Sequence, residues 1–122
     1  MTRTECTSGN LAVVETALSE VLGQAPRIIG PASCDKSAYS SDLVALVEID
    51  AAAAPADWRF APASDEAEAP LHLLAALDPE VFAGLDLAEL GFSGGFSREL
   101  RKNVYLLRLP SGRLFALVTD FF

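Results

Sequence analysis

Residues 103–122, NVYLLRLPSGRLFALVTDFF, consist of two apolar runs divided by Pro110-Ser111-Gly112. Proline fixes φ at the first corner of a type I turn, and glycine accepts the left-handed conformation that completes a three-residue hairpin loop. The stretch therefore predicts a terminal β-hairpin between residues 103–109 and 113–122. The predicted cross-strand pairs are Leu107 with Phe115, Tyr105 with Leu117, and Val104 with Val118. Both faces of this hairpin are apolar, so we expect a central place in a sheet or a face covered by a partner.

A helix is predicted at residues 11–22. Apolar residues recur there with helical spacing and form a stripe along one face. Asn10 is the expected N-cap, Gly23 ends the helix in a left-handed conformation, and Pro26 prevents it from resuming. The apolar stripe consists of Leu11, Val14, Leu18, Val21 and Leu22.

The middle of the chain predicts short strands and short helices. Residues 27–29, 43–50 and 58–60 have strand patterns, and the polar stretch 30–42 between the first two predicts a loop. Helix start and stop signals then follow one another closely, which favours three brief helices at residues 71–77, 78–84 and 87–90. The acidic segment 64–69 that precedes them is expected to be a solvated face.

These elements predict an α+β fold. We expect an N-terminal helix and short helices packed on a mostly antiparallel sheet of four or five strands that ends in the hairpin. A length of 122 residues is typical of one domain, so residues 1–122 are expected to fold as a single unit.

Charge and hydropathy narrow the class of protein. The net charge of −8 argues against sequence-independent nucleic-acid binding. The apolar runs are too short to span a membrane and no secretory signal is evident, so we expect a cytoplasmic protein without a membrane partner. The charge is uneven: residues 1–91 hold 4 Lys/Arg against 15 Asp/Glu, a balance of −11, and residues 92–122 hold 5 against 2, a balance of +3.

No catalytic or metal site is predicted. Cys6 and Cys34 are expected to be free thiols, because one bridge is not a disulfide framework. A cation beside it, Lys36, could activate the Cys34 thiol, but an unreactive thiol is the favoured interpretation, because the only histidine available as a base is His72, far away in the sequence. Neither a Cys-x-x-Cys pair nor a second histidine supports a zinc site, and no cofactor is expected.

The strongest candidate site is an anion cradle at residues 93–102. Paired glycines precede a possible helical turn with three cations, and exposed amides at a helix start bind phosphate or carboxylate. No Walker-type Gly-Lys-Ser/Thr follows the glycines, and a solvated basic connector is the alternative interpretation. The candidate anion-binding residues are Ser93, Gly94, Gly95, Ser97, Arg98, Arg101 and Lys102.

Function is predicted from this scarcity of catalytic residues. An acidic chain with apolar strands suits a non-enzymatic protein-interaction module, such as an adaptor, chaperone or immunity-type inhibitor. Its expected partner is another protein or a second copy of the chain. The alternative is a small-ligand-binding or enzyme domain that uses the cradle at residues 93–102.

Overall fold

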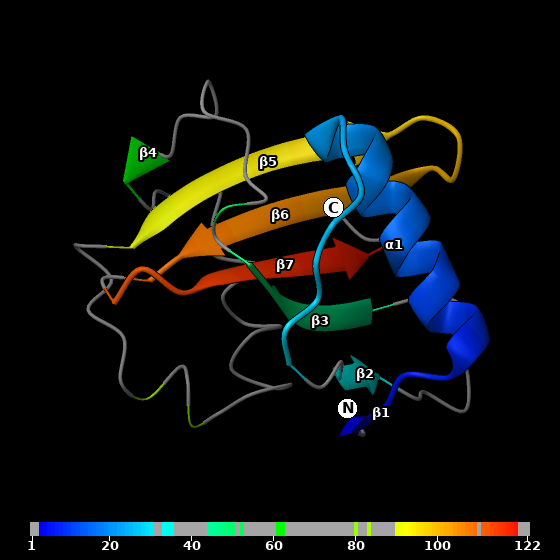
Figure 1. Ribbon diagram of the computed structural model, residues 1–122, viewed down its shortest axis with the longest axis horizontal. Helices are drawn as coiled ribbons and strands as arrows, with labels where there is room; N and C mark the ends of the chain where they lie inside the picture. The colour runs from blue at the N-terminus through cyan, green and yellow to red at the C-terminus, as the bar shows by residue number, and fades with distance from the viewer. Residues whose placement is uncertain are drawn as a thin grey trace.

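The fold combines one long helix with one antiparallel sheet (Figure 1). The computed structural model describes residues 3–30, 33–35, 44–50, 52, 61–62, 80, 83, 90–109 and 111–119. The elements are β1 (Arg3–Glu5), α1 (Ser8–Leu22), β2 (Ser33–Asp35), β3 (Val44–Ile49), β4 (Ala61–Pro62), β5 (Gly91–Ser97), β6 (Lys102–Arg108) and β7 (Leu114–Thr119). The strand order is β1-β2-β3-β7-β6-β5-β4. The α+β class agrees with the prediction, but the sheet has seven strands because short strands extend a centre of four long ones.

The β6–β7 pair has the register that the sequence predicts. The three predicted pairs are all present, and the strands lie in the interior of the sheet. At the turn, the Gly112 N–H donates to the Leu109 carbonyl at 2.9 Å, and the Leu109 N–H donates to the Arg113 carbonyl at 2.9 Å. Gly112 has φ 93°, the left-handed conformation that glycine adopts without strain.

Helix α1 begins earlier than predicted and ends where predicted. Its N-cap is Thr7, whose hydroxyl accepts from the Asn10 N–H at 3.1 Å, so the predicted cap Asn10 lies inside the helix. The first turn is polar and contributes nothing to the apolar stripe, which is why periodicity missed it. At the other end, Gly23 has φ 75° and donates its N–H to the Ser19 carbonyl at 3.0 Å.

The sheet is buried on both faces. α1 lies across β5, β6 and β7 on one face (Figure 1), where its buried side chains form the first core. A second core lies on the opposite face and includes Leu90 and Phe92. Both faces of β7 are buried along its whole length, as expected for a central strand. Sheet residues of the first core are Cys34, Ala45, Val47, Ile49, Val104, Leu106, Leu114, Ala116 and Val118, and those of the second are Val44, Leu46, Phe92, Leu107, Phe115 and Leu117.

Of the strands, loop and short helices predicted for residues 27–90, some agree with the structure, some differ and some lie outside the described residues. The strand predicted at 43–50 is present as β3, whereas the one predicted at 27–29 is a single bridge between Ile28 and Ile49. The predicted loop 30–42 contains β2, which pairs with β3 despite its polar sequence. The strand predicted at 58–60 lies outside the described residues, and so do the three short helices, apart from the isolated positions 80, 83 and 90.

Candidate functional site

The predicted anion cradle is a strand and a turn, not a helix start. Ser93, Gly94, Gly95 and Ser97 lie in β5, residues 98–101 form a turn, and Lys102 begins β6. The two strands pair residue by residue from Gly91 opposite Arg108 to Ser97 opposite Lys102. Pairing with the apolar strand β6 thus overrides the poor strand propensity of the glycines.

A carboxylate of the chain itself occupies the amides at this turn. Glu20, near the end of α1, accepts from the Arg98 N–H at 2.9 Å and from the Glu99 N–H at 3.4 Å. The Ser97 hydroxyl donates a short hydrogen bond to the same carboxylate and accepts from the Leu100 N–H at 3.2 Å. The exposed amides that the sequence suggested therefore exist, but the anion they hold is internal.

These contacts make Glu20 a stronger acid than usual. The Ser97 hydroxyl, followed by the backbone amides of Arg98 and Glu99, holds the pKa of the Glu20 carboxyl below its ordinary value of 4.5. Ser97 is fully buried although the Glu20 residue is exposed. The carboxylate thus supplies the acceptor that a buried hydroxyl needs, and it fixes the end of α1 to the β5–β6 turn.

Gly95 has a packing role. A Cβ at Gly95 would lie 2.7 Å from Val21 Cγ1 of α1, closer than real Cβ contacts. At the neighbouring Gly94 a Cβ would lie at an ordinary 3.5 Å from the Tyr105 ring. Gly95 therefore lets α1 approach β5 closely, which explains one of the two glycines without a ligand.

The hydrogen-bond pattern of β6 determines which backbone groups of β5 point outward. In an antiparallel sheet, the N–H and C=O of one residue point to one neighbouring strand, and those of the next residue point to the other. The Leu109 N–H bonds to the carbonyl of Arg113, the residue just before β7, so the backbone groups of odd-numbered residues of β6 face β7 and those of even-numbered ones face β5. The register joins even-numbered residues of β6 to odd-numbered residues of β5. Gly94 and Phe96 therefore direct their backbone groups away from β6.

Among the described strands, only β4 pairs with the outer side of β5, and it does so at one end. Strand β4 pairs with Gly91 and Phe92, and no other strand in the described part of the chain lies beside residues 93–97. Pro62, which has no N–H, stands opposite Gly91, whose backbone groups face β6. We call residues 93–97 the open edge, because unpaired strand edges accept a further strand.

An exposed aromatic side chain lies on the open edge. Phe96 is 53% exposed, whereas Phe92, four residues away on the same face of β5, is 8% exposed and stacks on Tyr105 at 5.7 Å between ring centroids. Burial raises the pKa of the Tyr105 hydroxyl. Ile29, at 52%, is the other large apolar side chain exposed among the described residues. The open edge thus combines outward backbone groups that pair with no described strand with a large exposed apolar side chain.

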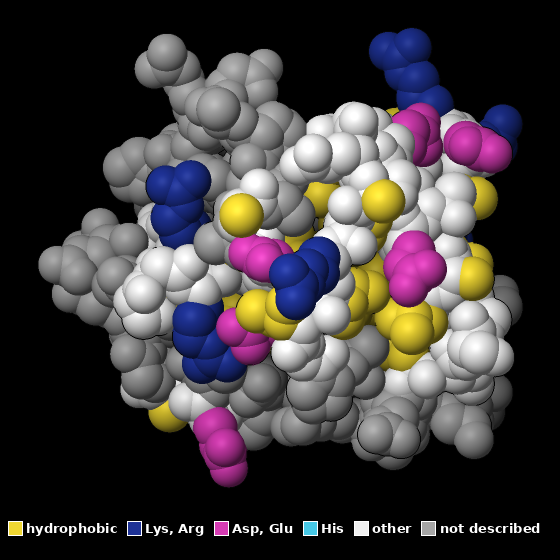
Figure 2. Space-filling model, in the orientation of Figure 1, with side chains coloured by type: hydrophobic (Ala, Val, Ile, Leu, Met, Phe, Trp, Pro, Cys, Tyr) yellow, Lys and Arg dark blue, Asp and Glu magenta, His cyan; other side chains and the backbone are white. Residues whose placement is uncertain are grey.

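The turn beside the open edge carries exposed cations. In Figure 2, basic side chains project at the upper right, where Figure 1 shows the β5–β6 turn, and acidic side chains lie next to them. Arg98 and Arg101 are exposed, and so is the single acidic residue of the turn, Glu99. Arg101 has φ 54°, a left-handed conformation that glycine, Asn and Asp adopt more readily than other residues.

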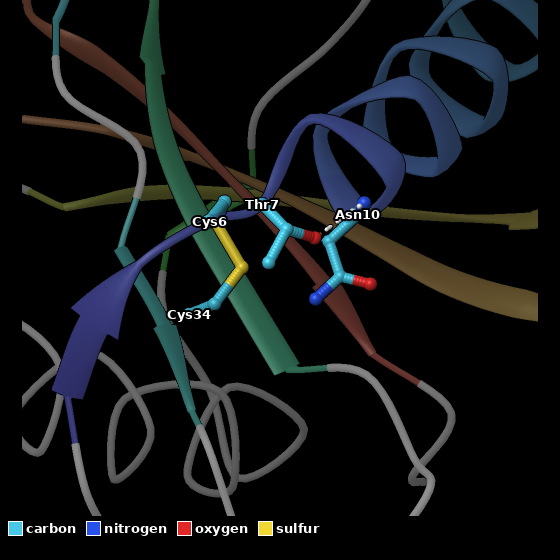
Figure 3. The surroundings of a disulfide bond; sticks show 4 residues. All are labelled: Cys6, Thr7, Asn10 and Cys34. Carbon is cyan, nitrogen blue, oxygen red and sulfur yellow. Dashed lines mark hydrogen bonds between the residues drawn. A yellow bond between two sulfur atoms is a disulfide. The ribbon is translucent and has the colours of Figure 1, made fainter.

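The opposite end of the sheet is closed by a disulfide, contrary to the predicted free thiols (Figure 3). Cys6 lies between β1 and the Thr7 cap of α1, and Cys34 lies in β2, 2% exposed. The β1–β2 pair has Thr4 opposite Cys34 and so brings Cys6, two residues further along, near Cys34; the two cysteine Cα atoms are 5.0 Å apart, a separation that a disulfide can span. Sequence reasoning missed the bond because residues 30–42 gave no strand signal that would bring the cysteines together.

Other chemical candidates gain no support from the geometry. Within the described ranges, no group of three or more His, Cys, Asp or Glu side chains is arranged to hold a metal ion. His72 and the acidic segment 64–69 lie outside those ranges. None of the helices described has both the length and the apolar composition needed to cross a bilayer. Comparisons with family models, with curated proteins and with solved structures found no match for the chain.

Proposed function

We propose that the protein is a non-enzymatic protein-interaction module whose docking surface is the open edge of β5. One observation carries the proposal: residues 93–97 combine outward backbone groups at Gly94 and Phe96 with the exposed Phe96 ring. Addition of a strand to an exposed sheet edge is a common mode of peptide recognition, in which backbone hydrogen bonds supply affinity and side-chain contacts supply specificity.

The test uses two matched bait variants. Phe96→Ser and Ile29→Ser each remove a large side chain of equal exposure, but only the first lies on the open edge. We expect a partner from the native host, or a second copy of the chain, to associate with the wild type and with Ile29→Ser and to be lost with Phe96→Ser. Equal recovery on all three baits, or a monomeric wild type that recovers nothing, contradicts the proposal.

The compartment belongs to the same proposal. Disulfides persist mainly in oxidising environments. The Cys6–Cys34 bond therefore favours such an environment over the cytoplasm predicted from the sequence. Alkylation of free thiols in protein extracted from the native host tests this point: we expect no labelled cysteine before reduction and two after it.

A second candidate is anion binding at the β5–β6 turn, favoured by the two amides and the hydroxyl that converge on Glu20. An external phosphate or carboxylate would have to displace the Glu20 side chain and would be held by Arg98 and Arg101. In a thermal-shift screen of phosphates and organic acids, this candidate predicts stabilisation of the wild type that the Arg98→Ala/Arg101→Ala variant loses. A screen without any shift excludes it.

A further inference from the structure

The chemistry of the partner is set by what surrounds the open edge, and this inference rests on the proposed function. The turn and the first residue of β6 hold the cations Arg98, Arg101 and Lys102, and the carboxylates at this turn are those of Glu99 and Glu20. The rest of the chain has the opposite balance. At physiological ionic strength, charges act over about 8 Å. The charges near the edge, and not the net charge of −8, therefore determine which charge is favoured on a strand that docks there.

Arg101 gives an independent reason to assign a role to this charge. The left-handed backbone conformation at this position favours glycine, but the residue is an arginine. The guanidinium is exposed and has no hydrogen bond or ion pair with any residue that the structure describes. An arginine in a strained backbone conformation, without a hydrogen bond or ion pair to the described residues, is consistent with a role in binding.

We propose that the open edge binds an extended acidic segment of a partner protein. The segment adds as a strand beside β5, bonds to the outward groups of Gly94 and Phe96, and lays an apolar side chain on the Phe96 ring. Its carboxylates meet Arg98 and Arg101 at the turn. The carboxylate of Glu20 already fills the amides of that turn, so the guanidinium groups, and not the amides, receive the acidic side chains.

A random-peptide display selection on the full-length disulfide-bonded protein tests this inference. Peptides that are selected are synthesised with a fluorescent label, and their affinity is measured by anisotropy. We expect enrichment of segments that combine acidic residues with an aromatic or β-branched one, and affinity that falls as salt is raised.

Matched variants identify the surface that binds. Phe96→Ser and Arg101→Gly are each expected to weaken the selected acidic peptides by about tenfold or more. Ile29→Ser and Arg27→Ser, which remove an exposed apolar residue and an exposed cation away from the edge, leave the affinity unchanged. Arg101→Gly also raises the melting temperature, since glycine relieves the strained φ, so its loss of affinity does not come from misfolding.

The outcomes separate this inference from the proposed function. Selection of neutral or basic peptides that still depend on Phe96 overturns the acidic partner and leaves the docking edge intact. Selection of acidic peptides whose affinity does not change with Phe96→Ser or Arg101→Gly also overturns the inference, because such peptides bind elsewhere. If no peptide is selected and the bait comparison above also recovers nothing, both the inference and the interaction module are wrong.

Discussion

The two edges of the sheet differ in how they end. At one edge, β1 and β2 are short and polar, and the Cys6–Cys34 bond ties them together beside the start of α1. At the other edge, β4 covers two residues of β5 and leaves residues 93–97 without a described neighbour. An unprotected edge is a liability that folded proteins usually block. The contrast is between one edge that a covalent bond holds and another to which we assign a docking role only as a proposal.

Four long strands connect the two edges. β3, β7, β6 and β5 pair continuously in antiparallel register, and α1 rests on this block. α1 is held to β5 by two contacts that are close in space: Val21 on Gly95, and Glu20 on the β5–β6 turn. Helix α1 therefore holds β5 in place behind the open edge. An edge that is ordered before binding loses less conformational entropy when a strand docks on it.

Breaking the disulfide should have the largest effect. The bond closes a loop with a sequence separation of 28, for which chain entropy predicts a loss of about 3.5 kcal/mol in the free energy of unfolding on reduction. Urea unfolding with and without reductant measures it. The Cys6→Ala/Cys34→Ala variant is the control and should not respond to reductant. Identical midpoints for the wild type in both conditions would show that the edge is not held by this bond.

Filling the space at Gly95 should have the next largest effect. Gly95→Ala forces the new methyl group against Val21, and overpacking of this kind costs about 1–3 kcal/mol. Gly94→Ala, which meets only an ordinary contact with Tyr105, should leave the free energy of unfolding nearly unchanged. Adding Val21→Ala to Gly95→Ala should recover part of the loss. Equal effects of the two alanine substitutions would contradict the close packing of α1 on β5.

Removing the charge of Glu20 should have a smaller effect that depends on pH. Because the folded state lowers the pKa of this carboxyl, its contribution to stability is full above the unfolded pKa and is lost as the pH falls through the folded value. Glu20→Gln should thus be less stable than the wild type at neutral pH and equally stable in acid. Glu15→Gln, an exposed position on the same helix, is the control. A stability difference that persists unchanged in acid argues against the carboxylate contact.

The sequence predicted the parts of the fold in which the local pattern and the tertiary contacts agree. The β6–β7 register agrees with the pairing that the turn signal in the sequence predicts, and α1 ends at the predicted Gly23. β2 and β5 were missed because their polar and glycine-rich sequences become strands only by pairing with β3 and β6. The disulfide could not be foreseen without β2.

The structure gives the predicted candidate segment a different chemistry from the one that the sequence suggested. The glycines and cations of residues 93–102 suggested an anion at a helix start, and the structure has an internal carboxylate at a strand turn instead. That pairing joins residues 77–79 positions apart, which no local pattern reports. The outward direction of Gly94 and Phe96 depends on the sheet register and was equally hidden.

Amide hydrogen exchange along β5, measured residue by residue by NMR, tests the open edge most directly. In an edge strand, amides that point outward exchange faster than those bonded to the neighbouring strand. We predict that Gly94 and Phe96 exchange much faster than Gly95 and Ser97, and that both become protected when a selected peptide binds. Uniformly slow exchange from Ser93 to Ser97 in the free protein would show that this edge is already covered and would contradict the account.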